Sequence, residues 1–482
     1  MNNKVDLLVR HGYLITMDKA DRVFKDGAVA IAGRRIVDAG EDAAIAARYK
    51  ARRVLDAGGA PVHPGLIECH LHASTLTLRG TLADQIKEDD LFDTFDCPYY
   101  NTVTEEEEYL GVLLAAIEMI RNGTTCFMEA GTVLQPMAAV RAAAEVGIRG
   151  LVGDAFLWDR PEGFVQGLQT PDKRGAHVPQ RITRAPKNRE EALARMGGVL
   201  KLNADPDALV TGHIALLGLG TASDELMLEA KRQADAAGTV VNLHQSYSPA
   251  DVEADRARFG KDPLVHLAEI GFLQRNVTMA HTNHLTDAEC EVLLERGTSL
   301  AKAPAASMLW GHGGCIHGRH AELWRRGANV CLGSDSGNWS NDFDIFKQAS
   351  LAALTAREAH LDRTYLSAED VFEMATRAGA RGIGMEDRVG SLEPGKRADI
   401  VIHTLNRPEL LPVTDMMRNL VHSSGSKSVH TVIVDGKLIL EKGRFVQIDE
   451  ERLLARINQG TQKMLQRVGF PVAPNQVGRR PR

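Results

Sequence analysis

Several features are scarce in this sequence of 482 residues, and each absence narrows the class of protein. The six cysteines lie far apart and form no Cys-x-x-Cys pair, so we expect a reduced protein without a disulfide framework. No apolar run is long enough to cross a bilayer, and the first residues lack the apolar core of a signal peptide. We therefore expect a cytoplasmic protein that does not associate with membranes.

The sequence also lacks an excess of basic charge. The sequence has 57 Lys and Arg against 63 Asp and Glu, which gives a net charge of −6, and no basic block stands out. Nucleic acid is therefore not an expected partner. With 44% hydrophobic and 25% charged residues, the composition is ordinary for a globular protein, and the length allows more than one domain. An enzyme or a binding protein for a small molecule fits these numbers.

Short apolar runs bounded by glycine and charged residues predict β-strands near both ends of the chain. They lie at 5–9, 27–31 and 35–39, and again at 399–402 and 429–440. In the last run Asp435-Gly436 predicts the type I′ turn of a hairpin. We expect residues 1–62 and 389–450 to form one small composite β-sandwich domain, and residues 451–482 to form a helix near 452–467 and a tail.

The middle of the chain alternates between strand and helix patterns. Eight apolar runs are separated by helical segments, and they lie at 66–70, 124–129, 149–154, 209–213, 239–244, 277–281, 299–303 and 329–334. Eight strand–helix units predict a closed parallel (β/α)8 barrel over residues 63–388. An insertion near 157–189 has no clean period, and we interpret it as a lid or an oligomer contact.

The first of these runs ends in two histidines, His70 and His72. Positions i and i+2 of a strand face the same side, about 6.6 Å apart at ~3.3 Å per residue, so both imidazoles can reach one metal ion. Two solvated histidines in a loop are the ordinary alternative, because His-x-His arises often by chance. Polar residues at the other strand ends favour the metal site.

In such a barrel, side chains at the carboxyl ends of the strands converge on one mouth. The polar residues there, besides the first pair, are His213, His244, His281, His284 and Asp335. Each alone has a structural interpretation, as a core histidine, a cap or a turn residue. Three histidines and a carboxylate on the first, fifth and eighth strands together suit one divalent ion, with zinc as first choice and iron, cobalt or manganese as alternatives.

A glycine-rich loop follows the seventh strand. It contains His312, His317 and His320, which we expect to be solvated or near substrate. Met308 and Trp310 in the same stretch are interpreted as packing residues. We expect Trp310 to contact the substrate as well.

Five motifs resemble those of the amidohydrolase superfamily, the metal-dependent hydrolases built on a distorted TIM barrel. They are the stretches 64–72, 118–125, 280–285, 332–335 and 390–399. The last is the most specific, and it is similar to the return of that family's chain into its small β domain. The resemblance covers most of the chain, and since the family is usually oligomeric it implies a homo-oligomer.

Within the superfamily, the chain resembles the mononuclear branch that holds adenosine-derivative deaminases, guanine deaminase and triazine hydrolases. The resemblance implies that His70, His72, His244 and Asp335 bind the metal, that His281 sits beside the hydrolytic water, and that His213 faces the substrate. A metal ion lowers the pKa of a bound water toward ~7, and Asp335 and His281 are then the expected catalytic residues. The binuclear branches need a lysine on the fourth strand, which here ends in Thr211-Gly212-His213.

One position departs from that branch. Its deaminases carry a glutamate three residues after the fifth-strand histidine, whereas this sequence reads His244-Gln245-Ser246-Tyr247. A phenol with a pKa of ~10 is a poor base at neutral pH. We therefore expect attack on the carbonyl carbon of a small amide, urea or (thio)carbamate, as in the phenylurea and molinate-type hydrolases, with Gln245, Tyr247 and His284 also near the substrate.

Two alternatives stay open. One is an aminohydrolase or dechlorinase that acts on a purine, pyrimidine or s-triazine ring, with Glu253 or His284 in place of the glutamate. The other is a non-catalytic family member used for assembly, which would be free to lose metal ligands that this chain retains.

Overall fold

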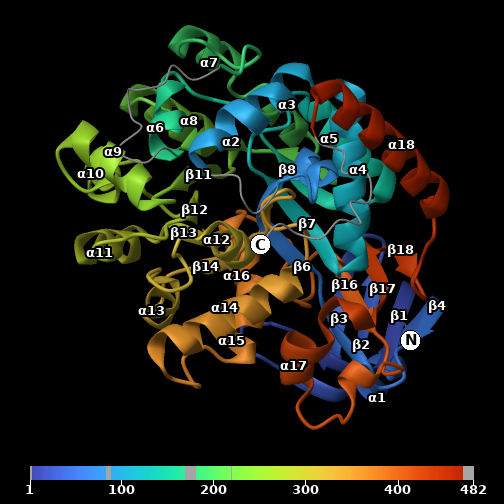
Figure 1. Ribbon diagram of the computed structural model, residues 1–482. Helices are drawn as coiled ribbons and strands as arrows, with labels where there is room; N and C mark the ends of the chain where they lie inside the picture. The colour runs from blue at the N-terminus through green and yellow to red at the C-terminus, as the bar shows by residue number, and fades with distance from the viewer. Residues whose placement is uncertain (1–2, 83–87, 169–180, 219, 471–482) are drawn as a thin grey trace, which may run out of the picture.

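The computed structural model describes residues 3–82, 88–168, 181–218 and 220–470. Within these ranges, the chain forms a β/α barrel and a smaller β domain to which both ends of the chain contribute (Figure 1). No helix in these ranges is long and apolar enough to cross a membrane.

The small domain is built on one nine-stranded sheet. Its strands are β1 (Asn3–Ile15), β2 (Val23–Ala32), β3 (Arg35–Glu41), β4 (Tyr49–Asp56), β5 (Pro61–Pro64), β16 (Ile400–His403), β17 (Val429–Val434), β18 (Lys437–Glu441) and β19 (Arg444–Phe445). The strand β5 joins the two ends of the chain, because it pairs in parallel with β1 and antiparallel with β16. The expected boundary after residue 62 therefore falls inside β5.

The predicted hairpin of the small domain is present. Strands β17 and β18 pair antiparallel across Asp435 and Gly436, whose φ angles are 52° and 76°. Both residues thus adopt the left-handed conformation that a type I′ turn requires at its two central positions. The turn chemistry alone was enough to place this element.

The barrel consists of two parallel five-stranded sheets. One has the order β10 (Ile214–Gly218), β11 (Val241–Gln245), β12 (Val277–His281), β13 (Ser299–Lys302), β14 (Val330–Leu332), and the other β15 (Asp335–Ser336), β6 (Leu66–His72), β7 (Thr124–Glu129), β8 (Arg149–Val152), β9 (Val210–Gly212). The fourth barrel strand breaks at His213 between β9 and β10, and the eighth breaks at 333–334 between β14 and β15. The predicted distorted (β/α)8 barrel is confirmed, and these two breaks are its distortion.

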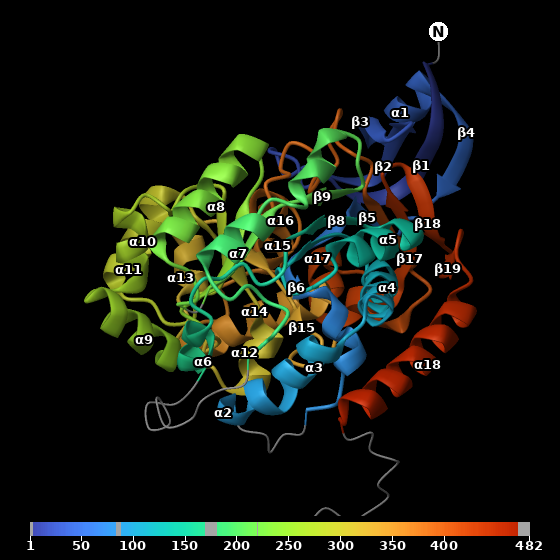
Figure 2. The same cartoon turned by 90° about the horizontal axis from the view of Figure 1, so that it is seen from above.

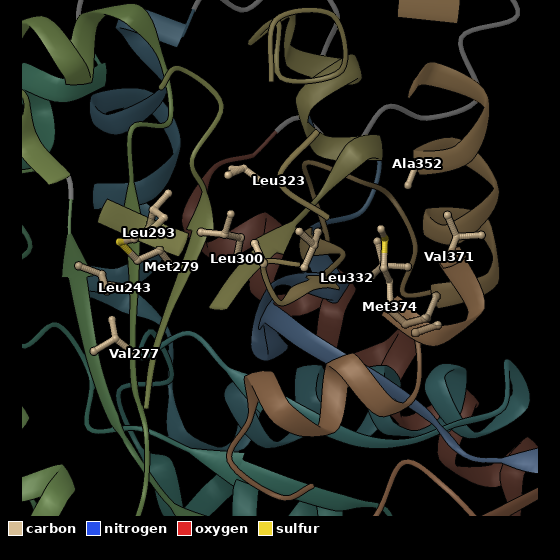
Figure 3. Close-up of a cluster of buried hydrophobic side chains, with 14 of the residues drawn as sticks. Leu243, Val277, Met279, Leu293, Leu300, Leu323, Leu332, Ala352, Val371 and Met374 are labelled. Carbon is tan, nitrogen blue, oxygen red and sulfur yellow. The ribbon is translucent and has the colours of Figure 1, made fainter. Parts of the chain in front are cut away.

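Apolar side chains between the strands and the outer helices hold the barrel together (Figure 3). Leu243, Met279, Leu300 and Leu332 come from four neighbouring strands, and each is at most 1% exposed. They pack with side chains of the outer helices, including Leu293 of α11 (Asp287–Arg296), Leu323 of α13 (His320–Arg325) and Val371 of α15 (Ala368–Met374). Burial of such a side chain stabilises the fold by roughly 1.5–3 kcal/mol, so this core fixes where the strands end.

Two helices at the barrel surface match the sequence pattern. Helix α4 (Glu105–Arg121) begins with the predicted capping box. The side chain of Thr104 accepts a hydrogen bond from the backbone N–H of Glu107, and the side chain of Glu107 accepts one from the backbone N–H of Thr104. Helix α18 (Glu450–Val468), expected near 452–467, packs against α4 (Figure 1). The contact is close, because a Cβ at Gly460 would lie 2.4 Å from Leu110. The expected tail after α18 lies outside the described residues from 471 onward.

The insertion near 157–189 is described in part, since residues 169–180 lie outside the described ranges. Its first half contains α6 (Glu162–Leu168) and the buried Trp158, whose Nε1 donates a hydrogen bond to the carbonyl of Pro186 at 2.8 Å. The two described halves are therefore tied together and packed on the barrel. Its role as a lid or an oligomer contact stays a prediction.

A buried ion-pair network joins the barrel to the small domain. Arg149 at the start of β8 is 1% exposed, and its guanidinium donates to both oxygens of Asp399 at 2.9 and 3.1 Å. It also donates to Asp435 at 3.1 Å, and Arg397 reaches the same oxygen of Asp435 at 3.2 Å. Burial alone would lower the pKa of Arg149, but the two carboxylates raise it, so the arginine stays charged.

Asp399→Ala should destabilise the protein strongly, because it leaves the buried charge of Arg149 without its bidentate partner. We expect a loss of about 3–5 kcal/mol in the free energy of unfolding, measured by denaturant titration. Glu105→Ala is the control, since Glu105 pairs with Arg141 where both side chains are 52% exposed, and it should cost ~0.2–1 kcal/mol. Equal losses in the two variants would contradict this account of the domain junction.

Candidate metal centre

Strand β6 places two imidazoles at the barrel mouth. His70 and His72 lie on the same side of the strand end with ring centroids 5.4 Å apart, while Leu71 between them is buried in the core on the other side. This is the arrangement that the alternation of a strand predicts. The ring of His70 is fully buried, and that of His72 borders a cavity.

A third imidazole, His244, comes from the end of β11. Its Nδ1 donates a hydrogen bond to the carbonyl of Leu217 at 2.6 Å, and its Nε2 lies 3.1 Å from Nε2 of His72. The Nδ1 of His72 bonds the hydroxyl of Thr132 at 2.9 Å, and Thr132 donates in turn to Glu129 at 3.1 Å. Both histidines are thus anchored through Nδ1 and turn Nε2 inward, as metal-ligating histidines commonly do.

The carboxylate of Asp335 completes the group from β15. Its Oδ1 lies 3.3 Å from Nε2 of His72 and 3.8 Å from Nε2 of His70, and its Oδ2 lies 3.9 Å from Nε2 of His281. Asp335 and His281 have φ angles of 71° and 70°, which is a strained conformation for residues other than glycine. Strain of this kind is retained where a site requires a particular side-chain direction.

Protonation states and unmet hydrogen bonds both fit a divalent cation. Burial lowers the pKa of His70 and His244, so these imidazoles are neutral. Burial alone would raise the pKa of Asp335, but the hydrogen bond with His72 and the electrostatic influence of the surrounding imidazoles hold it well below its usual range. Neutral imidazoles and an ionised carboxylate are the forms that bind metal.

Several buried nitrogen and oxygen atoms of this group also lack a hydrogen-bond partner. Within the described residues, neither ring nitrogen of His70 nor Oδ2 of Asp335 has a hydrogen bond. Buried polar atoms are rarely left in this state, because each costs about 1–3 kcal/mol. Atoms of His70, His72 and His244, and of His70, His281 and Asp335, lie within 4.8 Å of one another. We propose that His70, His72, His244 and Asp335 hold one divalent ion.

A cavity opens beside this group at the end of the barrel where α2 (Glu88–Leu91), α3 (Cys97–Thr102) and α6 gather (Figure 2). It is lined by His72, Asp96, Tyr100, Thr132, Phe156, Phe164, Leu217, His244, Tyr247, His281, Asp335, Ser336 and Trp339. Aromatic rings thus form much of its wall, while hydroxyl and carboxyl groups face it at a few points. Such a lining suits a flat, largely apolar ring with a few polar substituents.

Of the five residues predicted to contact substrate, Tyr247 lines this cavity and the other four do not. His213 is fully buried and its Nε2 donates to the carbonyl of Glu129 at 2.8 Å. Gln245 faces away from the cavity and donates to Asp255 at 2.8 Å. His284 donates to the carbonyl of His312 at 2.8 Å, and the ring of Trp310 lies against that of Trp339 at a tilt, with ring centroids 4.9 Å apart. Their placement does not support direct substrate contact.

Tyr247 stands where the resemblance expects a glutamate. Its hydroxyl forms a 2.7 Å hydrogen bond with Nε2 of His312, and its ring meets that of His281 edge-on at 4.9 Å. His312 is 5% exposed and His320 is 2% exposed, so neither is solvated, and the alternative that they lie near the substrate stays a prediction. The loop folds back over the barrel, and the Nε2 of His320 donates to the carbonyl of His281 at 2.6 Å.

Sequence reasoning missed Asp96, Tyr100 and Trp339 in the cavity wall. These residues lie in connections between barrel elements, where no strand or helix period indicates which side chain points inward. The acidic and aromatic stretch around Asp96 was the one available signal, and it is ambiguous by itself.

Comparisons with known proteins identify the family of the chain. The profile of the amidohydrolase family matches residues 62–439. A 5-methylthioadenosine/S-adenosylhomocysteine deaminase of Syntrophobacter fumaroxidans is 32% identical over 456 residues, which cover 95% of this chain and 98% of the relative. A 5′-deoxyadenosine deaminase of Methanosarcina mazei is 30% identical over 465 residues, covering 96% and 99%.

Solved structures also resemble the chain. An adenosine deaminase of Xanthomonas campestris with bound zinc has a TM-score of 0.86 at 27% identity, and the match covers 97% of this chain and all of the other. The zinc complex of an atrazine chlorohydrolase from Arthrobacter aurescens has a TM-score of 0.82 at 22% identity, covering 94% and 100%. This second likeness shows a shared fold.

His244→Ala should reduce the metal content of the purified protein, because it removes one of the four proposed ligands. We expect the content, measured by elemental mass spectrometry, to fall well below one ion per chain. His284→Ala is the matched control, since His284 follows the next strand end without facing the cavity, and it should keep the wild-type content. A full complement of metal in His244→Ala would contradict the ligand assignment.

Proposed function

Because the chain belongs to the amidohydrolase family, we propose that it is a metal-dependent hydrolase that removes an amino group from a heteroaromatic ring. The observation that supports this most directly is the buried set of three imidazoles and one carboxylate beside a cavity with aromatic walls. The relatives that match nearly the whole chain are named as deaminases of adenosine derivatives. An amino-substituted purine, free or as a nucleoside, is therefore the first substrate to test.

The relatives favour this alternative over the carbonyl reaction expected from Tyr247. Their names refer to amino-substituted rings and not to amides, ureas or carbamates. An assembly role without catalysis is disfavoured because all four proposed metal ligands are present and the hydrogen bonds that orient His72 and His244 are formed. The cytoplasmic location and the homo-oligomer stay predictions.

A divalent ion held by this group would lower the pKa of an adjacent water and supply a nucleophilic oxygen near neutral pH. Asp335 can take a proton from the attacking water, because its Oδ2 is turned toward the cavity side and has no hydrogen bond in the described residues. The same carboxyl can then pass that proton to the leaving amine.

His281 is placed to act on the same reaction. Its Nε2 faces Oδ2 of Asp335 at 3.9 Å, and the ring is fixed by the edge-on contact with Tyr247. A donor in this position can hydrogen-bond the oxygen that adds to the ring and stabilise the charge that develops there. Phe156, Phe164 and Trp339 can stack against a planar substrate, and the hydroxyl of Tyr100 faces the same cavity.

Two substrate panels test the proposal. One holds amino- and halo-substituted purines, their nucleosides, pyrimidines and triazines, and the other holds N-aryl ureas, carbamates, thiocarbamates and anilides. We expect ammonia release from members of the ring panel, loss of that activity after chelation, and its return with added zinc. Asp335→Asn is the negative control, because it removes both a ligand and the proton carrier.

The opposite pattern would refute the proposal. Turnover confined to the carbonyl panel would support hydrolysis of an amide, urea or (thio)carbamate, the reaction expected from the sequence because of Tyr247. Metal-loaded protein that is inactive on both panels would favour the assembly role. Ammonia and amine are measured separately, because deamination of a ring releases ammonia whereas cleavage at a carbonyl carbon releases an amine.

A further inference from the structure

Asp96 lines the cavity together with the metal-site residues, although no motif marks it. It is the last residue of a π-helical segment, η2 (Phe92–Asp96), which joins α2 to α3 within one helical run. Wide turns of this kind inside a helix are often found at functional sites, because they redirect a single side chain. Here the redirected side chain carries a carboxyl group.

The carboxyl of Asp96 has no structural task of its own. It precedes α3 but makes no capping hydrogen bond, and no described residue donates a hydrogen bond to it or forms an ion pair with it. Other buried acids nearby are satisfied by the backbone. Glu108 accepts from the amides of Leu134 and Gln135, and Glu129 accepts from those of Gly131 and Thr132. An acid left without partners in a cavity wall is available to a ligand.

Ring deamination needs a group that the cavity otherwise lacks. A proton must reach the ring nitrogen next to the attacked carbon, and Tyr247 is a poor carrier because its phenol has a pKa of ~10. The two candidates considered from the sequence are also misplaced, since Glu253 is exposed on α9 (Pro249–Phe259) and His284 donates to a backbone carbonyl. Among the described residues lining the cavity, Asp96 and Asp335 are the carboxylates.

We propose that Asp96 carries a proton from the attacking water to the ring nitrogen, in place of the absent glutamate. This inference rests on the proposed function. The placement suits the task, since Asp96 lines the same cavity as Asp335 and His281. A carboxylate beside the reacting atoms can accept a proton from water and release it to a ring nitrogen.

The step balances with two proton carriers. The water oxygen bonds to the ring carbon that bears the amine, and one water proton passes to Asp96 and from it to the adjacent ring nitrogen. The second water proton passes through Asp335 to the amine. The carbon–nitrogen bond then breaks, ammonia leaves, and the ring keeps a carbonyl oxygen and a protonated nitrogen.

A simpler role must be separated from this one, because Asp96 could instead bind a hydroxyl of a sugar attached to the ring. The experiment therefore uses the best ring substrate of the wild-type enzyme in two forms, with and without its sugar or other substituent. The variants are Asp96→Ala, Asp96→Asn and Tyr247→Phe. Asp90→Ala is the matched control, since Asp90 is exposed on the same helical run and does not line the cavity.

We expect Asp96→Ala to lower kcat about 10²–10⁴-fold on both forms of the substrate, with little change in KM and with the metal content of the wild type. Formate should restore part of the activity of Asp96→Ala, because it fits the space left by the carboxyl and carries the proton. Asp96→Asn keeps the shape, so it should lose activity equally without rescue. Asp90→Ala should stay within about twofold and Tyr247→Phe within about tenfold of wild type.

Binding gives a readout that does not depend on turnover. A ring analogue with a hydroxyl on the tetrahedral carbon and a hydrogen on the adjacent nitrogen mimics the state after proton delivery. By calorimetry, its affinity should fall at least tenfold in Asp96→Ala, because the N–H loses its carboxylate acceptor. The affinity of the amino-substituted ring without its sugar should change little, because its ring nitrogen carries no hydrogen.

Different failures have different meanings. With an active wild type, an effect of Asp96→Ala on KM alone, or only on the sugar-bearing substrate, makes Asp96 a binding residue and overturns the inference. An active Asp96→Ala together with a large loss in Tyr247→Phe assigns the proton transfer to the Tyr247–His312 pair and also overturns it. Absence of ammonia release from any ring by the wild type overturns the proposed function itself.

Discussion

Three imidazoles and one carboxylate lie together at one end of the barrel, and much of the structure serves to keep them there. Such a group is unfavourable without a cation, because its lone pairs face one another with no donor between them. His70 and Asp335 show this directly, since their buried atoms lack partners in the described part of the chain. A bound divalent ion would make the same arrangement favourable, because the lone pairs and the carboxylate charge would then coordinate a cation.

The barrel supplies the rigidity that this group needs. Apolar residues on β11–β14 pack with the outer helices and fix the strand ends, while the Arg149 network fixes the small domain against β8. The break between β14 and β15 gives Asp335 its left-handed backbone and turns its carboxylate toward His72. The anchors Thr132 and Leu217 hold the ring orientation of His72 and His244, so each histidine presents the same nitrogen to the centre.

Sequence reasoning could predict the part of the site that depends on strand alternation. His70, His72 and His244 follow from positions on apolar runs, and the convergence of strand ends follows from the barrel. The prediction that Gln245 contacts the substrate neglected this alternation, because Gln245 follows His244 on the same strand and therefore faces the opposite side. His213 failed for another reason, since the break between β9 and β10 turns its ring toward the carbonyl of Glu129, and no periodicity reveals such a break.

The cavity wall could not be predicted from periodicity at all. Asp96 and Trp339 reach it from connections whose path depends on packing against distant segments, and Tyr247 is held by His312, which is 65 positions away in the sequence. The most direct test of the central claim is X-ray absorption spectroscopy of the zinc-loaded protein. The account predicts a shell of nitrogen and oxygen at about 2.0–2.1 Å with the scattering of three imidazoles. A sulfur shell at ~2.3 Å, a second metal at ~3.5–4 Å, or fewer than three imidazoles would contradict it.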